Sequence, residues 1–505
     1  MKRSLRYLDP TERHYDAKGL RSAEPCNDRT GPAQQKMGLP KLPTQRMTQP
    51  DPSKEVYELL DVAMKKLAIV STYNENCGNA SYTHVLMKAF SKYVNVDIIP
   101  LDLFLLQNQS PSLIKAGDRH IKKIASRLKD YDYVNIQFEG GLYGARIPDV
   151  YRRLCWLIDA AQNVTLTMHR VDSDQAPLGL AIRTGIATRS YRRFKVLRGG
   201  NKFAGLSESI VRHCQRASKR KNVWIKVHTR RERRSVSEIY GNTNVYDYPL
   251  AFLTPDEQAE AWSHRDRAAF LEKHGFSPDD KVIGLFGYLS NYKGIETAIE
   301  ALSYLPTDYK LGLFGSQHPQ TIKRGEAVNP YLQSLFNLID NIDDRSYERA
   351  KKVAALNSQR IRADGKTSYG EGAPKPLAER IRFIGSLPDP DFIEALRLCD
   401  ATVLPYAEVG QSMSGVAVLG IEAGAKMICA NNHSFFETRR YYPDTFWGFD
   451  MGNAYELAQK IIRCATNPIE AERREARMRA LSEYNIDASV RIQLEKFGYL
   501  ESGTN

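Results

Sequence analysis

Short apolar runs recur along most of the chain, and stretches with helical periodicity separate them. Six runs fall in the first half: KLAIVSTY, VNVDIIPLD, YVNIQFEG, VTLTMHR, VWIKVHT and VYDYPL. Five follow in the second half: VIGLFG, YKLGLFG, IRFIG, ATVLP and KMICA. Runs of this length between helices are typical of strands that are buried on both faces of a parallel sheet. The two series therefore predict an α/β protein with two doubly wound domains.

The rest of the chain is divided around these two series. We expect an N-terminal extension over 1–65, which is largely polar and contains a proline-rich stretch. A first Rossmann-like domain is expected over 66–255 and a second over 256–465. The span between YKLGLFG and IRFIG is long for a simple crossover, so an insertion is predicted at about 319–378. A strongly amphipathic C-terminal helical segment over 466–505 ends the fold.

The composition and charge are those of a globular protein with an anionic partner. Of the 505 residues, 42% are hydrophobic and 10% are aromatic, which excludes general disorder. Lysine and arginine number 72 against 59 acidic residues, which gives a net charge of +13. Such a balance favours contact with nucleotides, phosphorylated glycans, acidic membranes or nucleic acid, and charge alone does not choose among them.

The cysteines and the apolar segments indicate where the protein works. The seven cysteines are scattered and form no close pairs of the kind that bind zinc, so we expect reduced thiols. No apolar run approaches the roughly 20 residues of a membrane span. The N-terminal residues also lack the apolar core of a signal peptide. We therefore expect a cytoplasmic protein, with peripheral contact to the inner face of a membrane left open.

The turn after the run VIGLFG has the features of a phosphate-binding turn. Gly287 lets the chain leave the strand tightly, Lys293 adds a mobile cation, and Gly294 opens a helix without a side chain. A helix N-terminus at the carboxyl end of a parallel strand offers unpaired N–H groups to an anion. Taken alone, the turn is better explained by a solvated lysine at a helix start.

Two further strand ends repeat this pattern. Ser412 and Ser414 can cap a helix that begins near Gly415, and Gly78 precedes a helix expected to begin at Ser81. Each could be an ordinary capped helix, but three together favour a cleft for a diphosphate. The chain has no Gly-x-Gly-x-x-Gly motif and no complete Walker A motif, Gly-x-x-x-x-Gly-Lys-Ser/Thr, which argues against a dinucleotide oxidoreductase and a P-loop ATPase.

The second half resembles the nucleotide-sugar domain of GT-B glycosyltransferases, in particular retaining family 4. The segments that carry the resemblance are FGYLSNYKGIETAIEALSYLP, RIRFIGSLPDPDFIEALRLCDATVLPY, GQSMSGVAVLGIEAGAKMICA and FDMGNAYELAQKI. The first half agrees more loosely, through CGNASYT, IQFEGGLYG and TMHRVDSD. The resemblance covers about residues 66–465.

The resemblance implies roles for individual residues. Lys293 would hold the donor diphosphate, the backbone at Ile384 and Gly385 would read the base, and His169 would lie beside the transferred sugar. Gln411, Ser412, Ser414 and Gly415, at the start of the donor-binding helix, would also contact the donor. The implied reaction moves a sugar from a nucleoside diphosphate to a glycan or glycolipid hydroxyl, with retention, in surface-polysaccharide synthesis. Fixed positive charge would replace a metal, so we expect no cofactor besides the donor substrate.

The chain departs from the family pattern at three positions. Tyr288 stands where an arginine is frequent, and Gln411 and Leu419 stand where two glutamates are frequent. Glu422 or Glu408 could take over the work of a carboxylate. The family also includes a GQSxSG variant of this segment, so the departures do not imply loss of activity.

Other charged residues are weaker candidates. Glu139 follows a strand and could orient an acceptor hydroxyl, although helix capping or a buried ion pair explains it as well. The DSD motif at 172–174 resembles the metal site of the GT-A fold, but the rest of the chain has no other metal cluster. Basic runs in the first domain suggest an anionic acceptor or membrane surface, and their strongest cluster is Arg230, Arg231, Arg233 and Arg234.

Two alternatives remain open at this point. One is an enzyme of the same fold that glycosylates a modified base in nucleic acid, with the basic runs on the phosphate backbone. The sequence contains no recognisable nucleic-acid-binding module, which makes this alternative the weaker one. The other is a catalytically inactive protein of this fold that serves as a binding or scaffold subunit.

Overall fold

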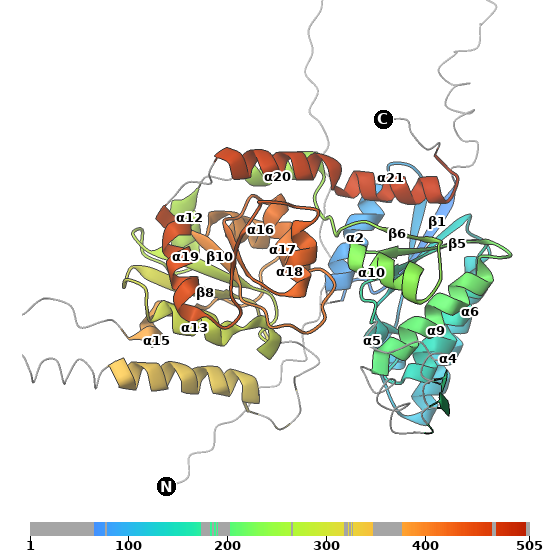
Figure 1. The fold of residues 1–505 in the computed structure, drawn as a ribbon, viewed down its shortest axis with the longest axis horizontal. Helices are drawn as coiled ribbons and strands as arrows, with labels where there is room; N and C mark the ends of the chain where they lie inside the picture. The colour runs from blue at the N-terminus through green and yellow to red at the C-terminus, as the bar shows by residue number, and fades with distance from the viewer. Residues whose placement is uncertain are drawn as a thin grey trace, which may run out of the picture. The chain divides into compact units, whose positions relative to one another are not determined.

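Two parallel β-sheets form the centre of the computed structural model (Figure 1). The residues that it describes are 65–75, 78–172, 182–183, 186–187, 189, 202–263, 266–317, 322, 325, 327–346, 376–466 and 471–500. The expected N-terminal extension lies almost wholly outside them, as does much of the predicted insertion. Residues 63–505 belong to one compact unit.

The first sheet contains the six strands that the first series of apolar runs predicts. Its strand order is β2-β1-β3-β4-β5-β6, and every neighbouring pair is parallel. The strands are β1 (Lys66–Ser71), β2 (Asn95–Pro100), β3 (Tyr133–Phe138), β4 (Asn163–Met168), β5 (Asn222–Val227) and β6 (Val245–Asp247). Every residue of β3 is buried, as expected for a strand that is covered on both faces.

The second sheet is also parallel, with the order β12-β11-β10-β7-β8-β9. Its strands are β7 (Lys281–Phe286), β8 (Tyr309–Phe314), β9 (Ile381–Phe383), β10 (Ala401–Leu404), β11 (Met427–Ala430) and β12 (Trp447–Phe449). Five of them match predicted runs. Strand β12 was not predicted.

Helices cover both sheets. In the first half they are α2 (Gly78–Phe90), α3 (Leu103–Leu106), α4 (Pro111–Leu128), α5 (Gly140–Tyr143), α6 (Ile147–Ala160), α9 (Lys202–Ala217), α10 (Arg230–Arg234) and the π-helix η1 (Ser235–Ile239). In the second half they are α11 (Pro255–Ser263), α12 (Arg267–Lys273), the 3₁₀ helix η2 (Asn291–Lys293), α13 (Ile295–Leu302), a helix over 330–346, α15 (Leu377–Arg380), α16 (Asp389–Leu398), α17 (Gly415–Glu422), α18 (His433–Arg439) and α19 (Ala454–Thr466).

The C-terminal segment forms two helices, α20 (Ala471–Glu483) and α21 (Ile486–Lys496), where the sequence pattern predicted one helical stretch. The two helices are separated at Asn485. Its side chain caps α21 by accepting a hydrogen bond from the N–H of Ala488 at 2.9 Å. Helix α21 then packs on the first domain, where the Phe497 and Tyr133 rings stack with centroids 4.7 Å apart. The last helix therefore completes the cover of the first sheet.

One hydrophobic core is shared by both halves of the chain. It joins residues of β1 and β7 with apolar residues of α17 and α21, including Ile69, Val282, Ile421 and Leu494. Two further cores lie on the other faces of the sheets, one among α4, α6 and α9 and one among α13 and α19. The shared core means that the C-terminal helices contribute to the packing of both domains.

Each sheet reverses its strand order once, between β1 and β3 in the first sheet and between β7 and β10 in the second. Loops on the two sides of such a point leave the sheet in opposite directions, and the crevice between them is where open α/β sheets bind ligands. The fold therefore directs attention to the loops that follow β1, β3, β7 and β10.

Glu422 holds the segment that connects the two sheets. Its side chain is fully buried at the end of α17 and accepts hydrogen bonds from the N–H groups of Phe252, at 3.0 and 3.1 Å, and Leu253, at 3.3 Å. Burial raises the pKa of Glu422 to about 8, so at neutral pH the carboxyl group is largely protonated.

We predict that Glu422→Ala lowers the free energy of unfolding by about 1–3 kcal/mol, because two buried N–H groups lose their acceptor. Glu422→Gln keeps a neutral acceptor oxygen of the same size and should lose much less. Denaturant titration of both variants measures this difference. Equal losses in the two variants would show that the hydrogen bonds to the connecting segment do not matter.

Candidate functional site

The loop between β7 and α13 has the shape that the sequence predicts for a phosphate-binding turn. Gly287 has φ +98° and Gly294 has φ +64°, a region that residues with a side chain rarely adopt. A Cβ atom on Gly294 would lie 2.0 Å from the carbonyl oxygen of Pro405. Gly294 is thus required both by its backbone conformation and by the close approach of the loop that follows β10, and α13 begins directly after it.

Lys293 lies at the centre of this loop and is buried, with 5% of its surface exposed. Its Nζ donates a hydrogen bond to the Tyr406 hydroxyl at 2.6 Å and lies 4.0 Å from the centroid of the Tyr406 ring. Burial lowers the pKa of Lys293 to about 7. Among the described residues, no carboxylate lies within ion-pair distance of this ammonium group. A bound anion would therefore supply the charge partner that the protein leaves out.

Gly287 keeps a side chain away from the ammonium group. A Cβ atom at this position would lie 3.2 Å from Lys293 Nζ. Because glycine has no side chain there, a ligand could approach the lysine from the carboxyl end of β7.

The loop after β10 leads into α17, as predicted. Ser414 caps the helix, because its Oγ accepts a hydrogen bond from the N–H of Ala417 at 3.3 Å, and Gly415 is the first helical residue. Ser412 has a different role from the predicted cap, because its hydroxyl donates to the carboxylate of Glu232 at 2.7 Å. Gln411 is half-buried beside it. The loop is thus tied to α10 of the first domain.

The corresponding loops of the first sheet carry Gly78 and Glu139. Helix α2 begins at Gly78 itself, three residues earlier than expected, and a Cβ atom there would meet no atom within 4 Å. Glu139 follows β3 and accepts a hydrogen bond from the side chain of Asn79. The pKa of Tyr292 is raised by burial and, secondarily, by the charge of Glu139. Glu139 is therefore near enough to the lysine loop to act on it electrostatically.

His169 directly follows β4, and its ring packs against Tyr82 and His228 with centroids 5.7 and 5.0 Å away. Its Nε2 lies 2.8 Å from the Oε1 atom of Gln137. Because an amide oxygen only accepts, Nε2 carries the proton and Nδ1 is the bare acceptor. Burial, followed by the charge of Lys226, lowers the pKa of His169 to about 3, so the ring is neutral at any working pH.

Sequence reasoning missed three residues of this site. Tyr406 follows β10 and holds Lys293, and an aromatic residue at a strand end was the only signal. Arg170 pairs with Asp172 at 2.7 Å and lies close to the loop after β10, since a Cβ atom on Gly410 would be 3.3 Å from its guanidinium. Glu232 is the one acidic residue within the basic run RRERR.

The remaining donor candidates have mixed outcomes. Ile384 and Gly385 follow β9, where the N–H of Ile384 donates to the carbonyl of Leu313 at 3.0 Å and Gly385 has φ +89° with open space beside it. Glu408 accepts hydrogen bonds from the N–H groups of Gly410 and His433, both at 2.8 Å. Glu422 is used by the connecting segment described above and so lies outside the donor site proposed below.

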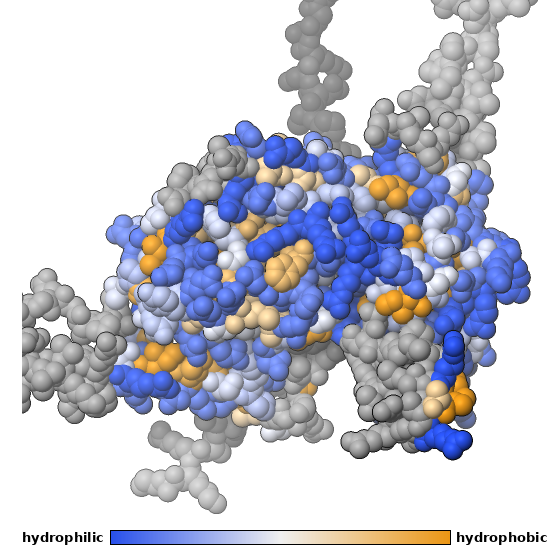
Figure 2. Space-filling view, in the orientation of Figure 1, coloured by the Kyte–Doolittle hydropathy of each residue, from blue (hydrophilic) through white to orange (hydrophobic). Residues whose placement is uncertain are grey.

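Two of the four arginines of α10 contact the second domain. The N–H of Arg231 donates to Glu437 at 3.1 Å, and the guanidinium of Arg230 lies 5.2 Å from the centroid of the Tyr441 ring. Arg233 pairs with Asp247 at 2.6 Å, and Arg234 is exposed. Figure 2 shows strongly hydrophilic residues gathered over α10 and α18 on the viewed face. A role of this cluster in acceptor binding stays a prediction.

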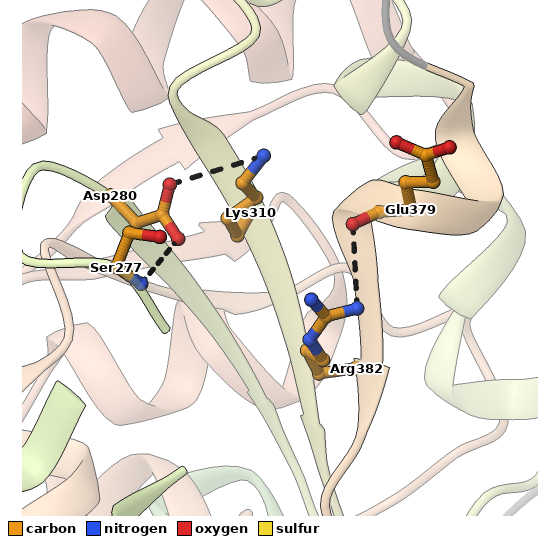
Figure 3. Close-up of a pocket in the computed structure, with 5 residues that line it drawn as sticks. All are labelled: Ser277, Asp280, Lys310, Glu379 and Arg382. Carbon is orange, nitrogen blue, oxygen red and sulfur yellow. Dashed lines mark hydrogen bonds and ion pairs between the residues drawn. The ribbon is translucent and has the colours of Figure 1, made fainter. Parts of the chain in front are cut away.

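A polar pocket of about 240 Å³ lies at the opposite ends of the strands (Figure 3). Its lining residues come from the amino ends of β7, β8 and β9 and the segments before them: Ser277, Asp280, Lys310, Glu379 and Arg382. Because α/β sheets bind their ligands at the carboxyl ends of the strands, this pocket is separate from the candidate site.

Known structures share this fold at low sequence identity. The Anabaena protein HepE in complex with UDP is 13% identical and matches 85% of this chain and 99% of its own with a TM-score of 0.52. Sucrose-phosphate synthase from Thermosynechococcus elongatus is 13% identical, with 86% and 98% covered and a TM-score of 0.55. A UDP-forming α,α-trehalose-phosphate synthase from Burkholderia vietnamiensis is 12% identical, with 87% and 100% covered and a TM-score of 0.56.

These likenesses show that the chain has the GT-B fold that the sequence predicts. No protein-family model and no curated protein sequence matches the chain. The assignment to retaining family 4 and to its GQSxSG variant therefore stays a prediction.

The described part of the chain contains no group of three or more His, Cys, Asp or Glu side chains that could hold a metal ion. Of the DSD motif, only Asp172 is described, and it pairs with Arg170. Five cysteines are described and all are free thiols. Within the same residues, no helix is both long and apolar enough to cross a membrane.

We predict that Gly294→Ala lowers the free energy of unfolding by more than about 1 kcal/mol, because the new residue would be forced into the left-handed region against Pro405. Gly78→Ala is the matched control and should stay within about 0.5 kcal/mol of the parent protein, since its Cβ meets open space. Thermal unfolding of both variants measures this. A harmless Gly294→Ala would contradict the close approach of the two loops.

Proposed function

We propose that the chain is a glycosyltransferase that moves a sugar from a nucleoside diphosphate to a hydroxyl group of an acceptor. The observation that carries this proposal is the buried Lys293, which has no carboxylate partner among the described residues and lies beside Gly287, where no side chain covers its ammonium group. The shared fold supports the proposal, because HepE was solved with UDP and with UDP-glucose.

The proposed chemistry depends on charge placement. Breaking the bond between the sugar and the diphosphate leaves negative charge on the departing phosphate oxygens. Lys293 and the N-terminus of α17 at Ser414 and Gly415 would stabilise that charge without a metal ion. Gly287 would let the diphosphate reach the lysine, and the backbone at Ile384 and Gly385 would contact the base.

The first domain would supply the acceptor side. Glu139 would orient the acceptor hydroxyl, and neutral His169 would accept a hydrogen bond from the sugar at Nδ1. Retention of configuration and a glycan or glycolipid acceptor are what the sequence resemblance implies. The basic cluster on α10 fits an anionic acceptor of this kind, or peripheral contact with an anionic membrane surface.

Two other functions give different results in the same measurements. An enzyme acting on nucleic acid would bind duplex with an affinity that falls about 10³-fold between 50 and 200 mM salt if about six phosphates are contacted. An inactive scaffold would bind a nucleotide sugar without ever consuming it.

The first test is a thermal-shift screen of nucleotide sugars, followed by transfer assays with the sugar that binds. A ligand at 100 times its dissociation constant should add about 2.7 kcal/mol to the free energy of unfolding. We expect transfer or slow hydrolysis of the bound donor to persist in EDTA. Failure of every nucleotide sugar to bind would overturn the proposal, and a strict need for Mn²⁺ or Mg²⁺ would overturn its mechanism.

Lys293→Ala should lower turnover by about 100-fold or more while the protein stays folded, which is the scale for removing one preorganised donor. The matched control is Lys310→Ala, which removes a buried lysine of the same sheet at the opposite pocket. It should leave the turnover of the folded enzyme unchanged. Turnover near normal in folded Lys293→Ala would remove the lysine from the mechanism.

The pH dependence of donor binding follows from the same lysine. A bound diphosphate would raise the pKa of Lys293 above its free value of about 7, so binding above that pH takes up a proton. The affinity for UDP-glucose should be constant below about pH 6 and fall towards tenfold per unit above about pH 7.

Lys293→Arg separates this effect from other titrating groups, because arginine stays charged at these pH values. The pKa of Lys226 also lies at about 7, as does that of Glu232, and both groups are retained in the variant. Calorimetric titration should find a flat pH profile for Lys293→Arg. An unchanged slope in this variant would assign the pH dependence to another group.

A further inference from the structure

A chain of buried side-chain amides connects His169 to the C-terminal helix α21. Gln137 accepts a hydrogen bond from His169 Nε2 at 2.8 Å and donates through its own Nε2 to the Oδ1 atom of Asn135. Asn135 in turn donates to the Oε1 atom of Gln493 on α21 at 3.0 Å. The three amide side chains are at most 1% exposed.

The register of the first sheet explains why these residues meet. Asn135 and Gln137 are two positions apart on β3, so their side chains lie on the same face. Strand β4 pairs with β3 in parallel, with Gln137 opposite Thr167, and His169 is two residues further along. The face is covered by α21, which brings Gln493 to the end of the row that is remote from the site.

The hydrogen bonds of the chain all have the same direction. Each amide accepts from the side of His169 and donates towards α21, so every carbonyl oxygen and all but the last amide nitrogen have a partner. The last nitrogen, Nε2 of Gln493, has no hydrogen-bond partner among the described residues. Aligned hydrogen bonds of this kind polarise one another in the low dielectric of the interior.

The direction has a chemical consequence for the histidine. An imidazole whose Nε2 donates to Gln137 must present Nδ1 as a bare acceptor, whereas the reverse direction would place the proton on Nδ1. The ring is also held from its sides by Tyr82 and His228. A sugar hydroxyl can donate only to the first of these two tautomers at Nδ1.

We propose that Gln137, Asn135 and Gln493 are positioning residues that fix the tautomer and orientation of His169, so that α21 takes part in building the site. The proposal rests on the proposed function for its effect on sugar transfer. The tautomer itself is a property of the free protein and can be measured without turnover.

The test is nitrogen-15 NMR of the full-length chain labelled at histidine, at one fixed neutral pH, with the signal assigned from its loss in His169→Asn. We expect the Nε2–H tautomer in the parent protein. Gln137→Leu removes the acceptor of Nε2 and should produce a mixture or the Nδ1–H tautomer.

Variants of Gln493, the amide furthest from His169, test whether α21 takes part. Gln493→Leu should shift the tautomer balance of His169 and lower kcat by about three- to tenfold, the loss expected for one net hydrogen bond, with KM for the donor unchanged. Gln493→Glu keeps the acceptor oxygen, so it should retain the Nε2–H tautomer of His169 and the kcat of the parent protein.

The matched control is Asn222→Ala. It removes a different amide contact to α21, the 3.0 Å hydrogen bond from Asn222 to the carbonyl of Lys496, which does not belong to the row of amides. It should leave the His169 signal and kcat unchanged. Because Gln137→Leu and Gln493→Leu break the chain at opposite ends, the NMR result of either folded variant is sufficient.

The outcomes separate the two proposals. A parent protein with the Nδ1–H tautomer would overturn the positioning role of the three amides, even if the enzyme transfers sugar. So would leucine variants with an unchanged His169 signal. If the tautomers are as expected but the protein transfers no sugar, the positioning role of the amides is supported and the proposed function is overturned. A response to Asn222→Ala equal to that of Gln493→Leu would show that α21 acts only through general packing.

Discussion

Every strand of a parallel sheet ends at the same edge, and this constraint places the candidate site. In each sheet the strand order reverses once, and such a point is where open α/β sheets bind their ligands. Glu139 follows β3 at the first reversal, and Lys293 and Tyr406 follow β7 and β10 at the second. Topology therefore brings Glu139, Lys293 and Tyr406 to the carboxyl ends of the strands, although they are far apart in the sequence.

Burial of cationic side chains is the second physical theme. Lys293 and Lys226 are both buried, and burial lowers the pKa of each to about 7. Lys226 donates to the hydroxyl of Ser489 on α21 at 2.7 Å and lies under that helix. Lys293 is next to Gly287, where no side chain covers its ammonium group. The same desolvation thus accompanies a packing contact at Lys226 and the proposed anion site at Lys293, and the two differ in the groups beside the nitrogen.

The C-terminal helices connect these features. The shared core contains residues of both sheets and of α21, and Glu422 on α17 holds the segment between the sheets. Helix α21 also covers the polar face of β3, where Asn135 and Gln137 would be costly to bury without partners. Gln493 supplies the acceptor at one end of that row and His169 the donor at the other. The packing of α21 and the hydrogen bonding of His169 are therefore parts of one buried network.

The sequence by itself determined the fold class and eleven of the strands, because runs of four to six apolar residues between helices leave few other solutions. It also located the lysine loop, since Gly287 and Gly294 have backbone conformations that favour glycine, whereas the close approach of Pro405 to Gly294 appears only in the structure. Strand β12 was not recognised. Only the tertiary structure decided that Tyr406 holds Lys293, that Glu232 accepts from Ser412, and that Glu422 faces the connecting segment. Likewise, the sequence predicted that β3 is buried on both faces, but only the structure shows that its polar residues Asn135 and Gln137 meet Gln493 there. Such pairings join residues up to 358 positions apart, and their energy depends on burial and direction, which no local pattern in the chain encodes.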